Sequence, residues 1–470
     1  MKGTRCDIGV VGLGVMGRNL ALNMGDKGFV VAGHDIDALK LEAFAREAEV
    51  PSIVVSKTID EFVRSLRSPR AVLILVPAGR PVDAVIDVLL PHLEAGDVLL
   101  DGGNSHFRDT EARAKRLAEK GIHFLGVGIS GGERGARLGP SIMAGGPEEG
   151  YERVQSILEA AAARADGKPC VARLGSGSAG TYVKMVHNGI EYGMMQLIAE
   201  SYDLMKEGLG LDSEDLREVY DGWAASELKG YLIEITARVF AKEDSETGHY
   251  LIDLIVDEAQ EKGTGKWTVV DAMELRVPVP TIAAAVSMRD QSYRKEERLQ
   301  ATKVFRKRQR AFAEEVEGFV TSLHKAMMSA ILVSYAQGMA LLQSASVEYG
   351  YGLDPEEVVR VWGGGCIIRS DLLAPIREAY RNRPDLGNPL LDPVIAQFIM
   401  NGEADLRRIV SAGSVHAIPV PAFAASLAYL DAFRSPWLPA NLIQAQRDYF
   451  GSHTYRRVDR EGQFHTEWEE

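Results

Sequence analysis

A chain of 470 residues is longer than a single hydrophobic core usually supports, so we expect at least two domains. Hydrophobic residues make up 46% and charged residues 25%, which is typical of a soluble globular protein. The formal net charge of −13 argues against nucleic acid and anionic membranes as main partners, because both would repel the chain.

Cysteine usage and hydropathy narrow the class of protein further. Cys6, Cys170 and Cys366 are far apart and form no CxxC pair, so we expect a reducing, cytoplasmic compartment. Asp7 interrupts the only apolar run near the start, which argues against a signal peptide. No run of about 18 apolar residues predicts a membrane span, and no HExxH or zinc-type His/Cys spacing predicts a metal site.

The first part of the chain alternates short apolar runs with amphipathic segments. This alternation predicts an α/β Rossmann-like domain over residues 1–178, built on a doubly wound parallel sheet. The expected strands are 7–14, 29–35, 71–79, 97–104 and 123–130. The expected helices are 15–28, 37–49, 81–93 and 109–121.

A glycine-rich turn follows the first predicted strand and opens the first predicted helix. A GxGxxG in this position allows a tight turn and turns the helix N-terminus toward a pyrophosphate, so it predicts dinucleotide binding. Its residues are Gly12, Leu13, Gly14, Val15, Met16 and Gly17.

An acidic residue ends the second predicted strand. Asp35, eighteen residues after Gly17, can accept hydrogen bonds from both hydroxyls of an adenosine ribose. A 2′-phosphate there would meet a like charge, and no arginine stands beside Asp35, so the pattern favours NAD over NADP. The alternative is that Asp35 only caps the helix beginning at Ile36.

Two polar loops follow later strands of the sheet. DGGNS (101–105) and SGGERGARLG (130–139) come after strands, where ligands of such folds bind. The glycines and serine of the second loop form a nest of backbone donors suited to a carboxylate. EKGTGKWT (261–268) adds Lys262 and Thr264 in a glycine-rich loop suited to a phosphate. Each segment could equally be an ordinary loop.

Long helical periodicities dominate after residue 178. They predict an all-helical domain over residues 179–440, followed by an aromatic and basic tail over 441–470 that frays or docks. The domain contains an internal duplication, because residues 208–219 resemble 350–361 at an offset of 142.

The segment KMVHNGIE (184–191) places four polar residues on one face of a helix. They are Lys184, His187, Asn188 and Glu191, at spacings 0, 3, 4 and 7. The duplicated copy has Ala326, Ser329, Ala330 and Val333 there, which favours chemistry in the first copy alone. If Lys184 and Glu191 form an acid–base pair, the neutral lysine would take a proton and the protonated glutamate would donate one. The alternative is that the four residues are only a solvated helix face.

Seven segments together closely resemble the 6-phosphogluconate dehydrogenase family over essentially the whole chain. They are GLGVMGRNLALNM, DGGNS, SGGERGAR, KMVHNGIEYGMMQ, KGTGKWT, VPVPTIAAAVSMRDQS and QAQRDYFGSHTY with FHTEW. The resemblance implies oxidative decarboxylation of 6-phospho-D-gluconate to D-ribulose 5-phosphate and CO2, with hydride transfer to a nicotinamide cofactor. It implies Lys184 as general base, Glu191 as general acid, and no metal.

The resemblance also implies which residues hold the ligands. For the carboxylate and hydroxyl end of the substrate they are Ser130, Gly131, Gly132, His187 and Asn188, with Asn104 bridging substrate and nicotinamide. For the phosphate they are Tyr192, Lys262, Thr264 and Arg289. Arg447 and His453 match tail residues that reach the neighbouring subunit's site, which implies a homodimer with exchanged tails.

The chain departs from the family where the cofactor's 2′-phosphate is held. The family usually has Asn-Arg-Ser or Asn-Arg-Thr after the second strand, and this chain has His34, Asp35 and Ile36. A nearby loop that often carries a lysine reads Val76, Pro77 and Ala78. These departures agree with the NAD preference expected from Asp35. Arg134 replaces a common glutamate, and we expect it at the surface.

Two other functions fit parts of the sequence. A shorter β-hydroxyacid dehydrogenase shares the glycine loop and the helical lysine, but it resembles only the first 300 or so residues and lacks the tail. A non-catalytic nucleotide sensor would be expected to lose Lys184 and Glu191, and both are present. The basic run 303–310 is typical of a solvated helix face.

Overall fold

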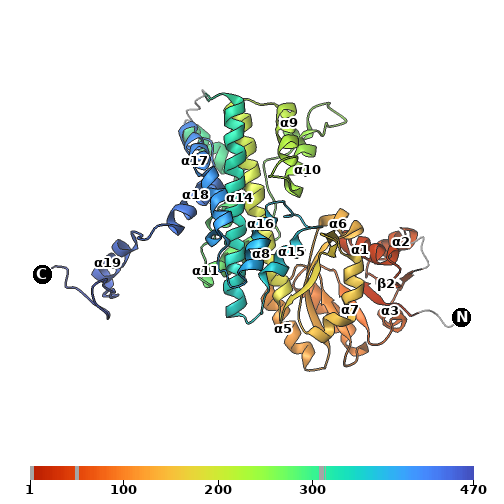
Figure 1. The fold of residues 1–470 in the computed structure, drawn as a ribbon. Coiled ribbons are helices and arrows are strands. Elements are labelled where there is room, and N and C mark those ends of the chain that lie inside the picture. The colour runs from red at the N-terminus through yellow and green to blue at the C-terminus, as the bar shows by residue number, and fades with distance from the viewer. Residues whose placement is uncertain (1–4, 48–51, 306–311, 313, 470) are drawn as a thin grey trace.

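The structure is a computed structural model that describes residues 5–47, 52–305, 312 and 314–469 (Figure 1). It has a Rossmann-like α/β domain with an eight-stranded sheet, followed by a helical domain and an extended C-terminal arm, residues 434–469. Most of the basic run 303–310 lies outside the described residues.

The sheet has the strand order β10-β7-β6-β5-β4-β1-β2-β3. All five expected strands are present, and the sheet gains further strands that short or weakly apolar segments form. The strands are β1 (Ile8–Val11), β2 (Val31–His34), β3 (Ile53–Val55), β4 (Ala71–Ile74), β5 (Val98–Asp101), β6 (His123–Ser130), β7 (Ser141–Gly145) and β10 (Val171–Gly175), with a separate hairpin of β8 (Arg164–Ala165) and β9 (Lys168–Pro169).

The expected parallel sheet is confirmed for the five expected strands, and one strand that was not expected runs antiparallel. β7 pairs antiparallel with β6. The connection between these two strands contains only the short helix α6 (Gly132–Leu138), whereas a parallel return needs a crossover of a dozen or more residues.

Helices cover both faces of the sheet through apolar side chains that meet the strands. One face packs against α1 (Val15–Asp26), α2 (Ala38–Glu47) and α7 (Glu148–Ala161). The other packs against α3 (Ile59–Ser65), α4 (Arg80–Leu89) and α5 (Phe107–Ala118). The carboxyl edge of β1, β4, β5 and β6 is therefore left to the loops that carry the expected site.

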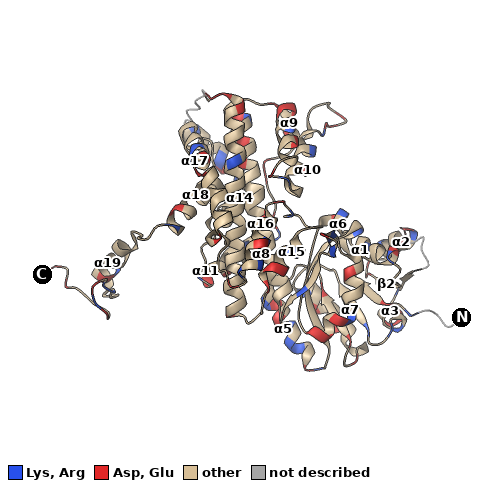
Figure 2. Cartoon of the chain, viewed as in Figure 1, with Lys and Arg blue, Asp and Glu red and all other residues tan. Residues whose placement is uncertain are grey.

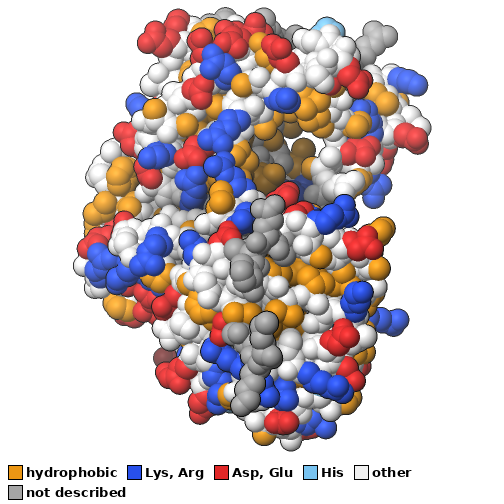
Figure 3. Space-filling model, turned by 90° about the vertical axis from the view of Figure 1, so that its right-hand side faces the viewer, with side chains coloured by type: hydrophobic (Ala, Val, Ile, Leu, Met, Phe, Trp, Pro, Cys, Tyr) orange, Lys and Arg blue, Asp and Glu red, His pale blue; other side chains and the backbone are white. Residues whose placement is uncertain are grey.

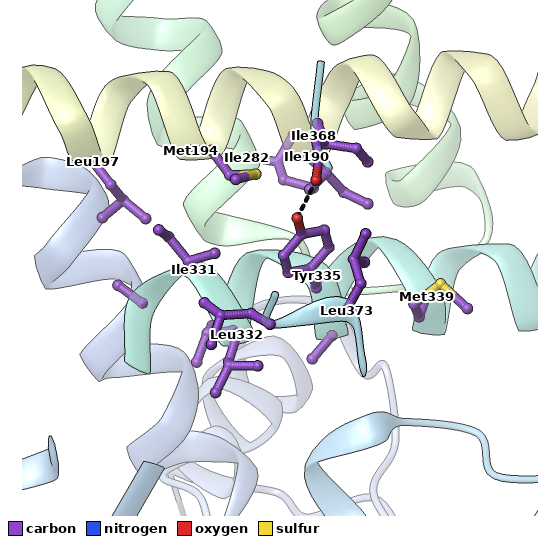
Figure 4. Close-up of a cluster of buried hydrophobic side chains, with 14 of the residues drawn as sticks. Ile190, Met194, Leu197, Ile282, Ile331, Leu332, Tyr335, Met339, Ile368 and Leu373 are labelled. Atoms are coloured by element: carbon purple, nitrogen blue, oxygen red, sulfur yellow. Dashed lines mark hydrogen bonds between the residues drawn. The ribbon is translucent and has the colours of Figure 1, made fainter. Parts of the chain in front are cut away.

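The helical domain is built around two long helices, α8 (Ala179–Asp203) and α14 (Val316–Glu348). Figure 4 shows side chains from both meeting around Tyr335, whose hydroxyl donates to the carbonyl of Ile368. By length and hydropathy α14 alone among the described helices could span a membrane, but 83% of its apolar window is buried against other helices. Its hydropathy is accounted for by core packing.

The remaining helices complete this domain and the arm. They are α9 (Ser213–Ala224), α10 (Tyr231–Phe240), α11 (Thr264–Glu274), α12 (Pro280–Ser292), α13 (Lys295–Val304), α15 (Pro355–Trp362), α16 (Leu373–Asn382), α17 (Pro393–His416), α18 (Pro421–Phe433) and α19 (Ala440–Gly451), with short turns η1 (Leu90–His92), η2 (Leu204–Gly208), η3 (Leu251–Leu254) and η4 (Pro389–Leu391).

The internal duplication is visible in the turns that end α8 and α14. Gly210 and Gly352, at the offset of 142, both have a positive φ, of 74° and 67°. Asp212 and Asp354 then cap α9 and α15 by accepting hydrogen bonds from the first-turn backbone. Both copies therefore place a glycine of positive φ and then an aspartate N-cap between the long helix and the helix that follows it.

Charge is mixed over the surface. Figure 2 shows acidic and basic residues interspersed along the elements of both domains. In the face drawn in Figure 3, the surface is hollowed between the Rossmann-like domain below and the helices above it. This hollow lies on the side of the molecule where α6 and α10 face each other.

Candidate active site

Three of the four polar residues on α8 are buried, and the fourth, Glu191, is half-buried. Lys184 is 6% exposed, His187 0% and Asn188 9%, while the side chain of Glu191 is 20% exposed. A solvated stripe would be largely exposed, so the helix-face alternative does not describe this surface. These side chains lie where α8 packs against the sheet and α11.

Glycine-to-glycine packing brings α8 this close to β6. A Cβ on Gly128 would lie 2.3 Å from the Lys184 Cβ, and one on Gly180 would lie 2.3 Å from the Gly126 carbonyl oxygen. No side chain separates the helix from the strand at these positions. Lys184 consequently lies beside the carboxyl end of β6, next to Ser130. We did not single out Gly126, Gly128 or Gly180, although glycines at i and i+2 on one strand face are a usable signal of close packing.

His187 is held by hydrogen bonds on both ring nitrogens. Its Nε2 lies 3.0 Å from Ser130 Oγ, and its Nδ1 lies 3.1 Å from Asn188 Oδ1. Because an amide oxygen only accepts, Nδ1 carries the proton and Nε2 accepts from the Ser130 hydroxyl. Burial and the neighbouring Lys184 place the pKa of His187 well below its ordinary value. The imidazole is therefore neutral.

This tautomer affects the state of Lys184. The Lys184 Nζ lies 3.3 Å from His187 Nδ1, which presents a proton to Asn188 rather than a lone pair to an ammonium. Burial lowers the pKa of Lys184, and the carboxylate of Glu191 opposes this effect only in part. A buried amine in these surroundings can lose its proton and act as a general base.

Glu191 has the complementary character. Its Oε2 lies 3.6 Å from His187 Nδ1, one turn along the helix. Burial raises the pKa of Glu191, against the opposing charges of Lys184 and Arg289. The two pKa values thus move toward each other, which is the arrangement expected of a base and an acid that act in one cycle.

The loop after β5 presents an amide to the same region. Asp101 accepts from Gly103 N at 3.1 Å and from Ser105 Oγ at 2.6 Å, and between them Asn104 has a φ of 57°. Asn104 Oδ1 is buried with no hydrogen-bond partner among the described residues. A small cavity here is lined by Asn104, Ser105, Gly128, Thr181, Lys184, Met185, Thr264 and Trp267. An orphaned acceptor beside Lys184 fits a ligand that donates a hydrogen bond.

The residues expected to hold a phosphate come together from three helices. Asn188 Nδ2 donates to Thr264 Oγ1 at 3.0 Å, and the Arg289 guanidinium carbon lies 3.5 Å from the centroid of the Tyr192 ring. Lys262 is exposed in the loop before α11. The group joins the Lys184 cluster through Asn188 and Thr264.

The glycine loop has the geometry of a dinucleotide site. Gly12 has a φ of 97°, and a Cβ there would lie 2.5 Å from the Leu75 carbonyl oxygen. A Cβ on Gly17 would lie 1.9 Å from the Gly12 carbonyl oxygen, so both positions require glycine. Gly14 has open space around it at the start of α1. Val76, Pro77 and Ala78 follow β4 beside the Asn104 loop, since a Cβ on Gly103 would meet the Val76 carbonyl at 2.5 Å.

Asp35 is fixed against this loop. Its Oδ2 accepts from Leu13 N at 2.7 Å and its Oδ1 from Asp37 N at 2.9 Å. The imidazole of His34 is buried and lies 3.0 Å from the Ser56 carbonyl, whereas Ile36 is 99% exposed. The alternative that Asp35 caps a helix beginning at Ile36 is wrong, because α2 begins at Ala38 and its Leu39 amide donates to Asp37 Oδ1 at 2.9 Å.

We expected no arginine beside Asp35, but the structure places a lysine near it. Lys40 Nζ lies 3.7 Å from Asp35 Oδ2 and 4.0 Å from Asp37 Oδ2. Lys40 is five residues from Asp35 in the sequence, so it is not a chain neighbour of Asp35. The first turn of α2 nevertheless returns the Lys40 side chain toward Asp35. The three side chains together still carry one net negative charge.

A second cavity, of about 270 Å³, lies between α6 and α10, and Gly131 forms part of its lining. Its lining includes Arg134, Tyr231, Arg238, Arg369 and Glu234, and Arg369 Nη2 lies 2.6 Å from Glu234 Oε2. The expected surface position of Arg134 is confirmed, since its side chain is exposed at this cavity.

Arg447 and His453 lie elsewhere. Both are on the arm, which extends away from the helical body (Figure 1). The structure does not bring them to the Lys184 cluster of their own chain.

Comparison with known proteins assigns both domains. A family model described as the NAD binding domain of 6-phosphogluconate dehydrogenase matches residues 7–175, and one described as the 6-phosphogluconate dehydrogenase C-terminal domain matches residues 180–468. The chain belongs to the 6-phosphogluconate dehydrogenase family.

Individual relatives cover nearly the whole chain. The NADP(+)-dependent decarboxylating 6-phosphogluconate dehydrogenase of Bacillus subtilis (strain 168) is 50% identical over 98% of both chains. The decarboxylating enzyme of Escherichia coli (strain K12) is 48% identical over 98% of both. A solved 6-phosphogluconate dehydrogenase from Plasmodium falciparum, described with NADP+ and with 6-phosphogluconate, matches with a TM-score of 0.95 and 45% identity over 98% of this chain and 100% of that one.

Membership of the 6-phosphogluconate dehydrogenase family bears on the shorter β-hydroxyacid dehydrogenase considered above. That alternative predicted a match confined to the first part of the chain. The match to the C-terminal domain extends to residue 468 and includes the arm.

Proposed function

We propose that this protein catalyses the oxidative decarboxylation of 6-phospho-D-gluconate to D-ribulose 5-phosphate and CO2, with NAD preferred as the hydride acceptor. The observation that carries the proposal is the buried Lys184–His187–Glu191 group beside Ser130 and Asn104. The activities named for the relatives from B. subtilis and E. coli support it.

The site residues would divide the reaction into proton transfers. The neutral amine of Lys184 takes the proton from the C3 hydroxyl, while bound nicotinamide supplies the chemistry of accepting the hydride from C3. The β-keto acid then loses its carboxylate as CO2, and the new ammonium of Lys184 stabilises the negative charge that develops on the C3 oxygen. Glu191 donates its proton to the carbon that becomes C1 of the product, and the keto sugar forms.

The other residues would bind and orient the substrate. Ser130, Gly131 and Gly132, with His187 and Asn188, hold the carboxylate and hydroxyl end. Tyr192, Lys262, Thr264 and Arg289 hold the phosphate. Incubation with 6-phosphogluconate and NAD should release CO2 and NADH in equal amounts. Faster turnover of a non-phosphorylated hydroxyacid would contradict the proposed substrate.

The NAD preference rests on Asp35. Each of its carboxylate oxygens accepts one backbone hydrogen bond and keeps capacity for a ribose hydroxyl. The net negative charge of Asp35, Asp37 and Lys40 opposes a 2′-phosphate. The B. subtilis relative is named as NADP(+)-dependent and the P. falciparum protein is described with NADP+, so the proposal predicts that this chain differs from both in cofactor preference.

Asp35→Arg is expected to move cofactor preference toward NADP. The ratio of kcat/KM for NAD to that for NADP should fall by about 100-fold or more, because like-charge contact costs on the order of several kcal/mol. Asp37→Asn removes one negative charge from the same turn without touching the glycine loop, and should change the ratio by less than about tenfold. Preference for NADP in the unmodified enzyme would refute the proposal.

The pH dependence of kcat should be bell-shaped. Burial lowers the pKa of Lys184 from its ordinary 10.5 and raises that of Glu191 from 4.5, so the two limbs of the profile should lie closer together than these two ordinary values. At low pH the amine gains the proton that it must accept; at high pH the carboxyl loses the proton that it must donate. Stopped assays of NADH formation at saturating substrate measure the profile, and a kcat independent of pH would contradict this assignment.

We also propose a homodimer in which the arm of each subunit reaches the other's site. Large apolar side chains on the arm are exposed, including Trp437 at 63%, Leu442 at 61%, Ile443 at 60% and Phe450 at 72%. An arm with such a surface, extended from the body, gains stability by packing on a second subunit.

A further inference from the structure

One carboxylate in the otherwise exposed arm is completely buried. Asp448 has an exposed fraction of 0%. Its Oδ1 accepts from Thr454 N at 2.9 Å and lies 3.0 Å from His465 Nδ1. Its Oδ2 accepts from Thr466 N at 3.1 Å and from Trp468 Nε1 at 2.9 Å. Asp448 thus joins the end of α19 to both halves of the segment that follows it.

The backbone on either side of His453 adopts an unfavourable conformation. Ser452 and Thr454 have φ values of 47° and 58°, in the left-handed region that non-glycine residues rarely occupy. Asp448 holds the Thr454 amide, and Gln444 Nε2 donates to the Thr454 carbonyl at 2.6 Å. The His453 turn is therefore maintained by side chains from α19, and it would relax without them.

The same group orients Arg447. Arg447 precedes Asp448 on α19 and points about 100° away around the helix, so its side chain stays exposed while Asp448 is buried. Arg447 Nη1 lies 3.2 Å from Gln444 Oε1, and Gln444 also holds Thr454. Tyr455 and Phe464 exchange two backbone hydrogen bonds of 2.8 Å and close the segment into a hairpin.

We propose that Asp448 is a positioning residue that fixes Arg447 and His453 in one arrangement before the arm meets the partner subunit. The inference rests on the proposed function, in which the arm reaches the partner's site and carries Arg447 and His453, the two tail residues that the family resemblance assigns to substrate binding there. A preformed arm loses less conformational entropy on binding than a segment that must fold there. Asp448 therefore acts on substrate affinity without touching the substrate.

The kinetic test compares Asp448→Asn with Asp459→Asn. Asp459 lies on the same arm and is exposed, and among the described side chains it forms an ion pair only with Arg457. Its variant therefore loses the same charge without loosening the hairpin. Asp448→Asn should raise KM for 6-phosphogluconate by about tenfold or more, with a smaller change in kcat and none in KM for NAD. Asp459→Asn should match the unmodified enzyme. A KM within about twofold of normal for Asp448→Asn would overturn the proposal.

Mixed dimers separate failure of this inference from failure of the shared site. Subunits with Lys184→Met have an inactive core and an intact arm, and subunits with Asp448→Asn have the reverse. Each mixed dimer should regain one site with a normal KM. If His453→Ala subunits are complemented by Lys184→Met subunits and Asp448→Asn subunits are not, the positioning role is wrong. If neither is complemented, the shared site is wrong.

A second variant covers the case in which Asp448→Asn does not fold. Trp468→Phe keeps an aromatic ring and removes one of the donors to Asp448. It should raise KM in the same direction by a smaller factor, with the dimer intact by sedimentation. An unchanged KM in that variant would contradict the positioning role of Asp448.

Discussion

Lys184→Met is expected to lower kcat by about 10²–10⁴-fold, the range that a general base contributes. Methionine keeps the length and apolar stem of lysine, so the packing of Lys184 Cβ against Gly128 should survive. The hydroxyl proton then has no acceptor, because the neutral His187 uses its Nε2 lone pair for Ser130. Initial rates of NADH formation, with binding of 6-phosphogluconate measured by calorimetry, test this expectation.

Lys325→Met is the matched control for this variant. Lys325 lies on α14, and its side chain is 52% exposed. Its Nζ lies 3.9 Å from Asp405 Oδ2, far from the proposed chemistry. The same substitution there should leave kcat near normal. Near-normal kcat in a folded, substrate-binding Lys184→Met enzyme would remove the basis of the proposed mechanism.

Gly180→Ala should have the largest effect on stability. The added Cβ would lie 2.3 Å from the Gly126 carbonyl oxygen and 2.5 Å from both Gly145 N and the Met143 carbonyl oxygen. All three are backbone atoms that cannot rotate away, so α8 must move from the sheet. Overpacking of this kind costs about 1–3 kcal/mol, occasionally more. Denaturant unfolding should show a lower free energy of unfolding, and kcat should fall because Lys184 moves with the helix.

Gly222→Ala supplies the contrast. Gly222 lies in the exposed part of α9, and a Cβ there meets nothing within 4 Å. Alanine has the higher helix propensity, so this variant should be as stable as the original or more stable by up to about 1 kcal/mol. Equal losses in both variants would show that close packing of α8 is not the cause.

Much of the site could be predicted because its signals are local. The glycine loop needs a positive φ at Gly12 and no side chain at Gly17, and such requirements are written in a few consecutive residues. The spacing of Lys184 and Glu191 likewise places them on one helix face whatever surrounds the helix. The strands that form the carboxyl edge also follow from local apolar periodicity.

Other features depend on contacts between distant segments and were missed. The antiparallel β7, the approach of Lys40 to Asp35 and the burial of Asp448 each depend on where the chain turns in space. The glycine contacts of α8 involve Gly126 and Gly145 from different strands.

The sequence by itself therefore determined the Rossmann-like and helical architecture, the dinucleotide loop and the identity of the residues proposed for chemistry. Only the tertiary structure decided that Lys184 and His187 are buried beside a half-buried Glu191 and that Ser130 and Asn188 select one tautomer of the histidine. The physical reason is that a pKa depends on desolvation and on neighbouring charges, and both arise from segments that meet only in the folded chain.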